Sequence, residues 1–169
     1  SIVLIWVSIN VTNCSDGVDG LSATLTIITL ITLYIVKGMK GTTDNFSYLI
    51  LLFVICLLGY LWYNAAPSHL MMGDAGSRAM GIFIAIAALK TESPFLYFFA
   101  AFVLIADGGI GIGKGALLRF LKIKILTNVR TPLHDHVRKV WDWSNTQTVF
   151  RFGIIQIVIS VATIYMLML

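Results

Sequence analysis

Long apolar runs separated by short polar segments dominate the chain. The runs lie at about 2–11, 21–36, 46–62, 79–89, 95–112 and 149–169. A backbone inside a bilayer must satisfy its own hydrogen bonds, so each run is expected to be helical, and the runs are too long and too uniformly apolar for the strands of a barrel. Since a spanning helix needs roughly 20 residues, the pattern predicts an all-α, polytopic transmembrane helical bundle with about five full spanning helices plus an N-terminal partial helix.

Two of the runs are short. The run at 79–89 is expected to extend into 76–78 and 90–91. The first run follows Ser1 rather than a methionine and has about half the length of a spanning helix, without the charged segment and cleavage site of a signal peptide. We therefore expect the sequence to be the C-terminal part of a longer chain and to form a single membrane-embedded domain.

Composition supports a membrane location. Apolar residues make up 58% of the chain and charged residues 12%, which is too little polar surface for a soluble globule of this size. The net charge of +4 does not indicate a nucleic-acid partner, because seven of the twelve Lys and Arg residues lie between 114 and 139, between apolar runs. That distribution is typical of a loop that faces anionic membrane lipid or phosphate. Cys14 and Cys56 lack metal or disulfide spacing and are expected to be free thiols.

Counting membrane crossings divides the loops into two sets. The segments at about 12–20, 63–78 and 113–148 fall on one side, and those at 37–45 and 91–94 fall on the other. The first side, with the flanking Arg151, holds nine of the twelve basic residues, five of the eight acids and all three histidines. Basic loops face the cytoplasm in membrane proteins, so the first set is predicted to be cytoplasmic and to carry the chemistry.

The segment 10–20 carries the strongest chemical signal. Its polar residues recur at every third position, which keeps neighbours adjacent on a helix, and Gly17 and Gly20 let the backbone approach a ligand closely. Oxygen-rich, sulfur-free clusters suit Mg²⁺, which takes one or two protein carboxylates and completes its shell with water and substrate phosphate. The alternative is a solvated loop whose acids cap the next helix. The candidate residues are Asn10, Asn13, Asp16 and Asp19.

A second polar cluster, at 69–78, adds the carboxylate of Asp74, with Asn64 ten residues before it. Asp74 precedes a predicted helix, so N-capping alone would explain it. However, Asp16, Asp19 and Asp74 are all predicted at one membrane face, and like charges brought together are costly unless a cation or ligand offsets the repulsion. These three acids are the candidate metal ligands.

A third cluster, at 131–139, contains His134, His136 and Arg138. A zinc site would need further Cys or His residues to complete a tetrahedral set. Histidines among basic residues suit hydrogen bonding to phosphate oxygens, and Asp135 is expected to orient one imidazole. The alternative is an exposed polar loop with no catalytic part.

A glycine-rich run at 108–114 matches G-x-x-x-x-G-K, but Gly115 stands where a phosphate-binding loop needs Ser or Thr. The glycines at 109–115 are instead expected to form close helix-packing surfaces. Asp107, just inside the same predicted helix, indicates a polar cavity or a partner, because an ionisable group in the membrane is costly.

Four motifs resemble those of the polyprenyl-phosphate N-acetylhexosamine-1-phosphate transferases. Residues 10–20 are similar to N-x-x-N-x-x-D-G-x-D-G, 64–67 to N-A-x-P and 72–77 to M-G-D-x-G-S. Residues 131–136 resemble the T-P-L-H-H-H signature of the phospho-N-acetylmuramoyl-pentapeptide branch, with Asp135 in place of the middle histidine. Two departures stand out: Met71 occupies a position where an aromatic is usual, and the family's upstream half, with its adjacent aspartates and lysine, is absent.

The resemblance implies a reaction and a setting. Undecaprenyl phosphate and UDP-N-acetylmuramoyl-pentapeptide would give the lipid-linked sugar pyrophosphate and UMP, in peptidoglycan synthesis at the cytoplasmic face of the bacterial cytoplasmic membrane. It further implies ten spanning helices in the intact enzyme, a homodimer and no nucleic-acid partner. The lipid carrier would reach the site along a groove between helices.

The resemblance also implies roles for the candidate residues. Asp74, with Asp16 or Asp19, would hold Mg²⁺. The substrate-positioning residues would be Asn10, Asn13, Asn64 and Arg138, and the catalytic residues would be Asp16, Asp19, Asp74, His134 and His136. Two other functions remain open: a transferase of N-acetylglucosamine-1-phosphate from the same superfamily, and a membrane transporter, although transport sites usually lie at the bilayer midplane.

Overall fold

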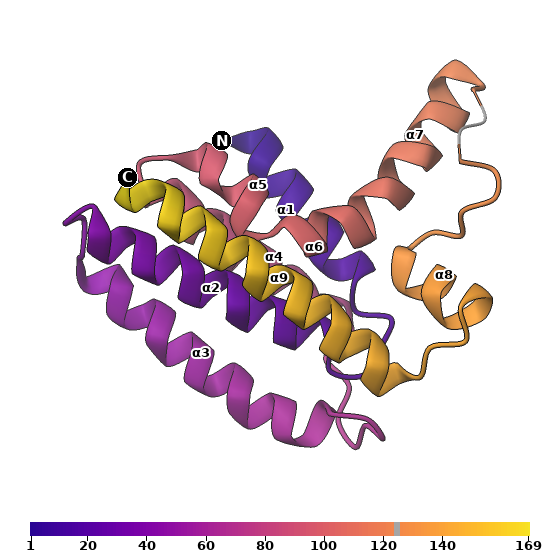
Figure 1. The fold of residues 1–169 in the computed structure, drawn as a ribbon, viewed down its shortest axis with the longest axis horizontal. Helices are drawn as coiled ribbons and strands as arrows, with labels where there is room; N and C mark the ends of the chain where they lie inside the picture. Colours follow the sequence, from indigo (N-terminus) through magenta and orange to yellow (C-terminus); the bar gives the residue numbers. More distant parts are fainter. Residues whose placement is uncertain (124–125) are drawn as a thin grey trace.

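The computed structural model describes residues 1–123 and 126–169. Within these residues the chain is helical and contains no strand, which confirms the predicted all-α class (Figure 1). The helices, in chain order, are α1 (Ile2–Cys14), α2 (Leu21–Met39), α3 (Asn45–Asn64), α4 (Gly73–Leu89), η1 (Pro94–Leu96), α5 (Tyr97–Ala100), α6 (Phe102–Leu104), the π-helical η2 (Ile105–Gly109), α7 (Ile110–Leu121), α8 (Leu133–Val140) and α9 (Asn145–Met168).

The number of spanning helices differs from the expected five. By length and hydropathy, three helices of the described chain qualify, α2, α3 and α9, and the pair Pro94–Ala100 and Phe102–Leu121, bent by 75°, would form a fourth span. Helix α4 has 17 residues, or about 26 Å at 1.5 Å per residue, which is at the short end of the spanning range. The polytopic helical class is confirmed, and α4 is the one predicted span that falls below the length of the other candidates among the described residues.

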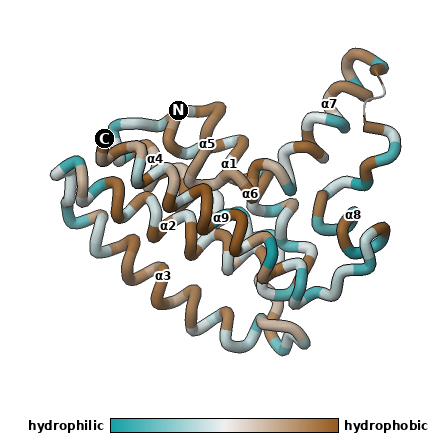
Figure 2. The backbone as a smooth tube through the Cα atoms, in the orientation of Figure 1, coloured by the Kyte–Doolittle hydropathy of each residue, from teal (hydrophilic) through white to brown (hydrophobic). Residues whose placement is uncertain are grey.

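Helix α2 lies at the centre of the bundle. It packs against α3, α4 and α9, and its leucines, such as Leu25, Leu30 and Leu33, are completely buried. Helices α3 and α9 instead have many large apolar side chains that are exposed, and both helices are largely hydrophobic in Figure 2. Exposed apolar side chains are typical of helices that face lipid, because the hydrocarbon core of a bilayer favours apolar side chains.

Helices α1 and α4 cross very closely. Ser8 Oγ donates to the carbonyl of Gly81 at 2.7 Å, and a Cβ added to Gly81 would lie 2.6 Å from the Cα of Ile9. Only glycine permits this approach of two backbones. The crossing brings the C-terminal end of α1 beside the first turns of α4.

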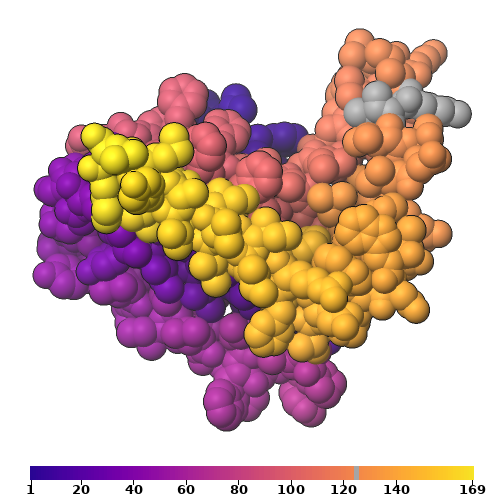
Figure 3. All heavy atoms as spheres, viewed as in Figure 1, coloured from indigo at the N-terminus to yellow at the C-terminus, as the bar shows by residue number. Residues whose placement is uncertain are grey.

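The run expected at 95–112 is broken at Ala101 and then continues to Leu121, nine residues past its predicted end. The segment predicted as a loop at 113–148 therefore contains most of α7 and all of α8. The end of α7 projects from the bundle (Figures 1 and 3). Gly113 and Gly115 lie on this projection, and a Cβ added to either would meet no atom of residues 1–123 or 126–169 outside the helix within 4 Å, so these residues form no close packing surface there. Gly108 makes the close contact instead, since a Cβ on it would lie 2.7 Å from the carbonyl oxygen of Val11.

Candidate functional site

Three polar segments gather at one end of the bundle. They are the α1–α2 loop, the α3–α4 loop and the segment around α8, where hydrophilic residues concentrate (Figures 1 and 2). Hydrogen bonds join the first two segments, and the ring of His134 lies against Gly17 in the first. The structure thus brings together the three motif segments that the sequence predicted on one membrane face.

Asn13 connects the first motif to the second. Its side-chain amide donates to Ser77 Oγ at 2.9 Å and to Asp74 Oδ1 at 3.3 Å. The other carboxylate oxygen of Asp74 pairs with Arg78 at 3.0 Å, and both of these side chains are mostly exposed. The close crossing of α1 and α4 makes the contact of Asn13 with Ser77 and Asp74 possible. The Asp74 carboxylate lies at the solvent-facing edge of the site.

Asp16 lies half-buried in the α1–α2 loop. Its Oδ1 accepts a hydrogen bond from Ser22 Oγ at 2.5 Å. Burial raises the pKa of Asp16, the bond from Ser22 opposes that effect, and the negative charge of Asp74 raises the pKa further. The repulsion between Asp16 and Asp74 is therefore present in the fold, and a bound cation would relieve it.

The small number of acidic side chains around Asp16 and Asp74 suits Mg²⁺ better than zinc or calcium. Within the described part of the chain, no three His, Cys, Asp or Glu side chains come close enough to hold a metal ion together. Zinc and calcium sites commonly use three or more protein ligands, whereas Mg²⁺ uses one or two carboxylates with water and substrate phosphate. Asp74, which accepts a hydrogen bond from Asn13, and Asp16, whose pKa the charge of Asp74 raises, are two carboxylates of the kind that a Mg²⁺ site uses.

Asn64 fastens two loops together. Its Oδ1 accepts a hydrogen bond from the backbone N–H of Gly20 at 2.9 Å, and its amide donates to Ser68 Oγ at 3.2 Å and to the carbonyl of Leu70 at 2.8 Å. The side chain is nearly fully buried, and Gly20 has a φ of +82°, which favours glycine. The amide oxygen and nitrogen of Asn64, which were expected to bind substrate, therefore bond to the protein itself. In this structure Asn64 holds the two loops of the site together.

Two other predicted residues have weaker links to the site. Asn10 donates to the carbonyl of Trp6 at 2.7 Å, one turn back on its own helix. Asp19 Oδ2 accepts from the backbone N–H of Ser68 at 3.4 Å. Asp19 therefore faces the α3–α4 loop.

His134 is held by a buried acid from another element. Its backbone N–H donates to Asp107 Oδ1 at 2.8 Å, and its Nδ1 lies 2.8 Å from Asp107 Oδ2. Asp107 is completely buried, in the π-helical segment η2, and such segments are frequent at functional sites. A Cβ added to Gly17 would lie 2.6 Å from His134 Nε2, so this ring nitrogen faces the first motif.

Asp135 does not orient an imidazole, which corrects the expectation from sequence. Its oxygens pair with Lys139 at 3.1 Å and Arg138 at 3.8 Å on the same helix. Burial raises the pKa of Asp135, but the hydrogen bond and charge of Lys139, with the charges of His134 and Arg138, outweigh it and lower the pKa. The acid that orients His134 is Asp107, 27 residues earlier in the chain.

His136 lies on a different face of α8 from His134. Residues two apart on a helix do not face each other, and while His134 is buried against Asp107, His136 is partly exposed with its ring 5.8 Å from that of Trp141. Its Nδ1 accepts from the backbone N–H of Arg130 at 3.3 Å. The two histidines therefore point into different parts of the loop region.

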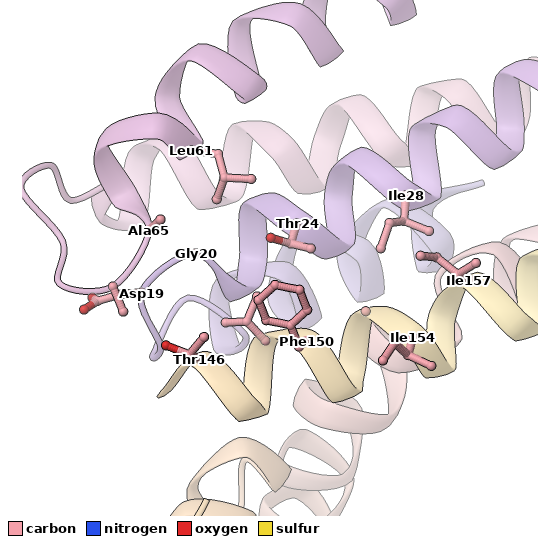
Figure 4. A pocket seen from close by; sticks show the side chains of 13 residues that line it. Asp19, Gly20, Thr24, Ile28, Leu61, Ala65, Thr146, Phe150, Ile154 and Ile157 are labelled. Atoms are coloured by element: carbon pink, nitrogen blue, oxygen red, sulfur yellow. The ribbon is translucent and has the colours of Figure 1, made fainter. Parts of the chain in front are cut away.

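An apolar groove of about 380 Å³ runs between α2, α3 and α9. Asp19 lies at the loop end of the groove, Phe150 nearer its middle, and Ile28 and Ile157 farther along the helices (Figure 4). The groove thus connects the polar loops with the apolar flank of the bundle.

The sequence indicated most of these residues but not their partners. Asp107 stood out as an acid inside an apolar run, yet nothing in its neighbourhood identified His134. Ser22 bonds to Asp16, and Ser77 bonds to Asn13. Nothing in the sequence around either serine predicted these contacts. Contacts between residues so far apart in sequence depend on helix packing, which local patterns do not encode.

The sequence matches a family model described as glycosyl transferase family 4 over residues 1–92. Similar curated proteins named phospho-N-acetylmuramoyl-pentapeptide-transferase include one from Treponema pallidum, 41% identical over 92% of this chain and 47% of that protein. Others come from Borreliella burgdorferi, 32% identical over 90% of this chain and 46% of that protein, and Campylobacter jejuni, 28% identical over 91% and 47%. The chain spans about half the length of the curated relatives it matches.

Proposed function

This chain belongs to glycosyl transferase family 4, and from that premise we propose that the protein transfers phospho-N-acetylmuramoyl-pentapeptide from its UDP-linked donor to undecaprenyl phosphate, releasing UMP. The names of the similar bacterial proteins support this donor. The observation that carries the proposal is the convergence of three motif segments at one end of the bundle, through Asn13 with Ser77 and His134 with Gly17.

The proposed reaction joins two anions, because a lipid phosphate attacks a pyrophosphate. Such reactions depend above all on positive charge and positioning. Asp16 and Asp74 would hold Mg²⁺, with Asp19 as a further carboxylate in the same α1–α2 loop as Asp16. The metal ion would supply the charge that offsets repulsion between the two substrates.

The protein groups around these acids would orient the substrates. Asn13 fixes one oxygen of Asp74, and the other oxygen, now paired with Arg78 in an exposed ion pair, would turn to the metal ion. His134 Nε2 faces the first motif, and His136 and Arg138 lie on the same short helix, where they would bind phosphate oxygens. Asn64 would contribute indirectly, by holding the α1–α2 and α3–α4 loops in place around the substrates.

The groove between α2, α3 and α9 would hold part of a polyprenyl chain. Its lining is apolar along the helices, and it ends at Asp19. A lipid phosphate could then reach the polar loops while its chain stays in the bilayer. The reaction would take place at the cytoplasmic face of a bacterial cytoplasmic membrane, and we propose a homodimer as the working assembly.

Release of UMP tests the enzyme class directly. Membranes containing the full-length protein would receive undecaprenyl phosphate and donor labelled in the uridine, with and without Mg²⁺. We expect Mg²⁺-dependent release of labelled UMP that UDP-N-acetylglucosamine does not compete away. Effective competition by UDP-N-acetylglucosamine would favour the N-acetylglucosamine-1-phosphate branch, and the absence of UMP with correctly folded protein would overturn the transferase proposal.

A further inference from the structure

Asp107 is a buried acid that the proposed reaction does not yet use. Its side chain has no solvent exposure and lies within the bent helix pair that qualifies as a span. A carboxylate in such surroundings is costly unless hydrogen bonds or an opposite charge compensate it. Both of its oxygens are in fact engaged, and both engage the same residue, His134.

The first contact anchors the start of α8. Pro132 occupies the N-cap position of this helix and offers no side-chain cap. Asp107 Oδ1 accepts the backbone N–H of His134, in the first turn of α8, and so supplies a cap from another element. A negative charge at this end of a helix is also favourable to the helix dipole.

The second contact selects the state of the ring. As an ionised carboxylate, Asp107 would only accept hydrogen bonds, and Nδ1 of His134 would then carry the proton shared with Asp107 Oδ2. In the neutral ring Nε2 is then the acceptor. Nε2 lies against Gly17, an exposed residue that follows Asp16 in the chain, whereas the His134 side chain itself is buried.

The neighbouring acid and histidine are arranged differently. Asp135 pairs with Arg138 and Lys139 of its own helix, and His136 accepts a backbone N–H at Nδ1, which leaves the proton on its Nε2. Of the imidazoles on α8, the described contacts give the Nδ1–H form to His134 and the Nε2–H form to His136. The local fold therefore sets two histidines in opposite tautomers.

We propose that Asp107 is a positioning residue that holds His134 with Nδ1 protonated and Nε2 directed at the α1–α2 loop. The inference rests on the proposed transferase function for its effect on rate, but the tautomer can be measured without it. Asp107 would act only through His134, by fixing which nitrogen the reacting phosphates meet.

Asp107→Asn provides the main test. The amide oxygen can still accept the backbone N–H of His134, whereas the amide nitrogen would donate toward Nδ1 and force the proton onto Nε2. We expect kcat to fall at least about tenfold with a donor KM within about twofold of wild type. In His134→Gln protein the same substitution should cost less than about twofold, because its target is gone. Asp135→Asn is the matched control and should keep wild-type kcat.

Nitrogen-15 spectra of histidine-labelled protein give a readout independent of transfer. The signal lost in His134→Gln identifies the residue, and it should show a protonated Nδ1 in the wild type and a protonated Nε2 in Asp107→Asn. A wild-type ring protonated only at Nε2, or additive losses in the double variant, would overturn the inference. Protein that shows the tautomer change but no transfer in any form would refute the proposed function and keep the positioning role.

Discussion

Gln156 on α9 accepts a hydrogen bond at 2.8 Å from the backbone N–H of Val103, across the break between α5 and α6. Its amide donates to the carbonyls of Phe99 at 3.2 Å and Ala100 at 3.0 Å. The side chain is completely buried. Broken helices in membranes persist where other groups satisfy the freed backbone, so one side chain replaces the bonds that the helix loses at Ala101.

We expect Gln156→Leu to destabilise the protein by at least about 2 kcal/mol, because each unsatisfied buried backbone group costs about 1–3 kcal/mol. Thermal unfolding in detergent would measure the change. The matched control is Thr163→Val on the same helix, whose hydroxyl bonds only to the carbonyl of Ile159 in its own helix. An equal, small loss in both variants would show that the break does not depend on Gln156.

Asp74→Asn should abolish transfer while leaving the protein folded. The amide keeps the shape of the side chain, and the lost ion pair with Arg78 is exposed, so it contributes no more than about 1 kcal/mol to stability. A metal ligand, by contrast, needs the negative charge. We expect no measurable turnover even at raised Mg²⁺, and at least about a tenfold loss, or roughly 1.4 kcal/mol, for Asp16→Asn and Asp19→Asn. Normal turnover with unchanged Mg²⁺ dependence in folded Asp74→Asn protein would remove the metal site.

Gly17→Ala should impair activity through His134. The new methyl group would lie 2.6 Å from Nε2 and would displace the ring. We expect kcat to fall about tenfold with little change in unfolding temperature, since Gly17 is exposed and the loop can shift. Gly113→Ala is the control, because no neighbour in the described part of the chain lies within 4 Å of the added carbon. If both alanine variants turn over alike, His134 does not work from its position beside Gly17.

Asp44 predicts an acid-sensitive contribution to stability at the opposite end of the bundle. The hydrogen bond from Lys90, opposed by burial and aided by Lys37, lowers the pKa of Asp44 to about 2 from 3.8. Because the folded pKa is depressed, the contribution is present above about pH 4 and is lost as the pH falls through 2.

The matched variant for this contribution is Asp44→Asn, which can still cap α3 through the capping box with Ser47. We expect the wild type to be the more stable protein above pH 4, with the difference shrinking between pH 4 and pH 2. Unfolding temperatures of the two proteins across that range would test it. A difference independent of pH would mean that Asp44 acts as a cap alone.

The predicted topology places Lys122 and Arg130 in the cytoplasm and Lys40 outside. Single cysteines at these three positions, in protein lacking Cys14 and Cys56, would be exposed to an impermeant thiol reagent on intact cells. Labelling is expected at 40 and not at 122 or 130. The reverse pattern would invert the topology and place the motif segments outside the cell.

The apolar runs and the spaced polar residues were readable from the sequence. Runs such as 21–36 and 46–62 became α2 and α3 because helices in lipid satisfy their own backbone and depend on local composition. The polar segments of the site were likewise recognisable by residue type, since carboxylates, amides and histidines at one membrane face indicate phosphate and metal chemistry.

Only the tertiary structure decided which of those residues meet. Because α1 and α4 approach closely at Gly81, the Asn13 amide can donate a hydrogen bond to Ser77. Asp107, in the π-helical segment, contacts the ring of His134. From the sequence, Asp135 was expected to orient an imidazole, because it lies between the two histidines. A local pattern does not reveal a partner 27 residues away. Residue types follow from local chemistry, whereas partners follow from how closely whole helices approach, and that depends on packing along their full length.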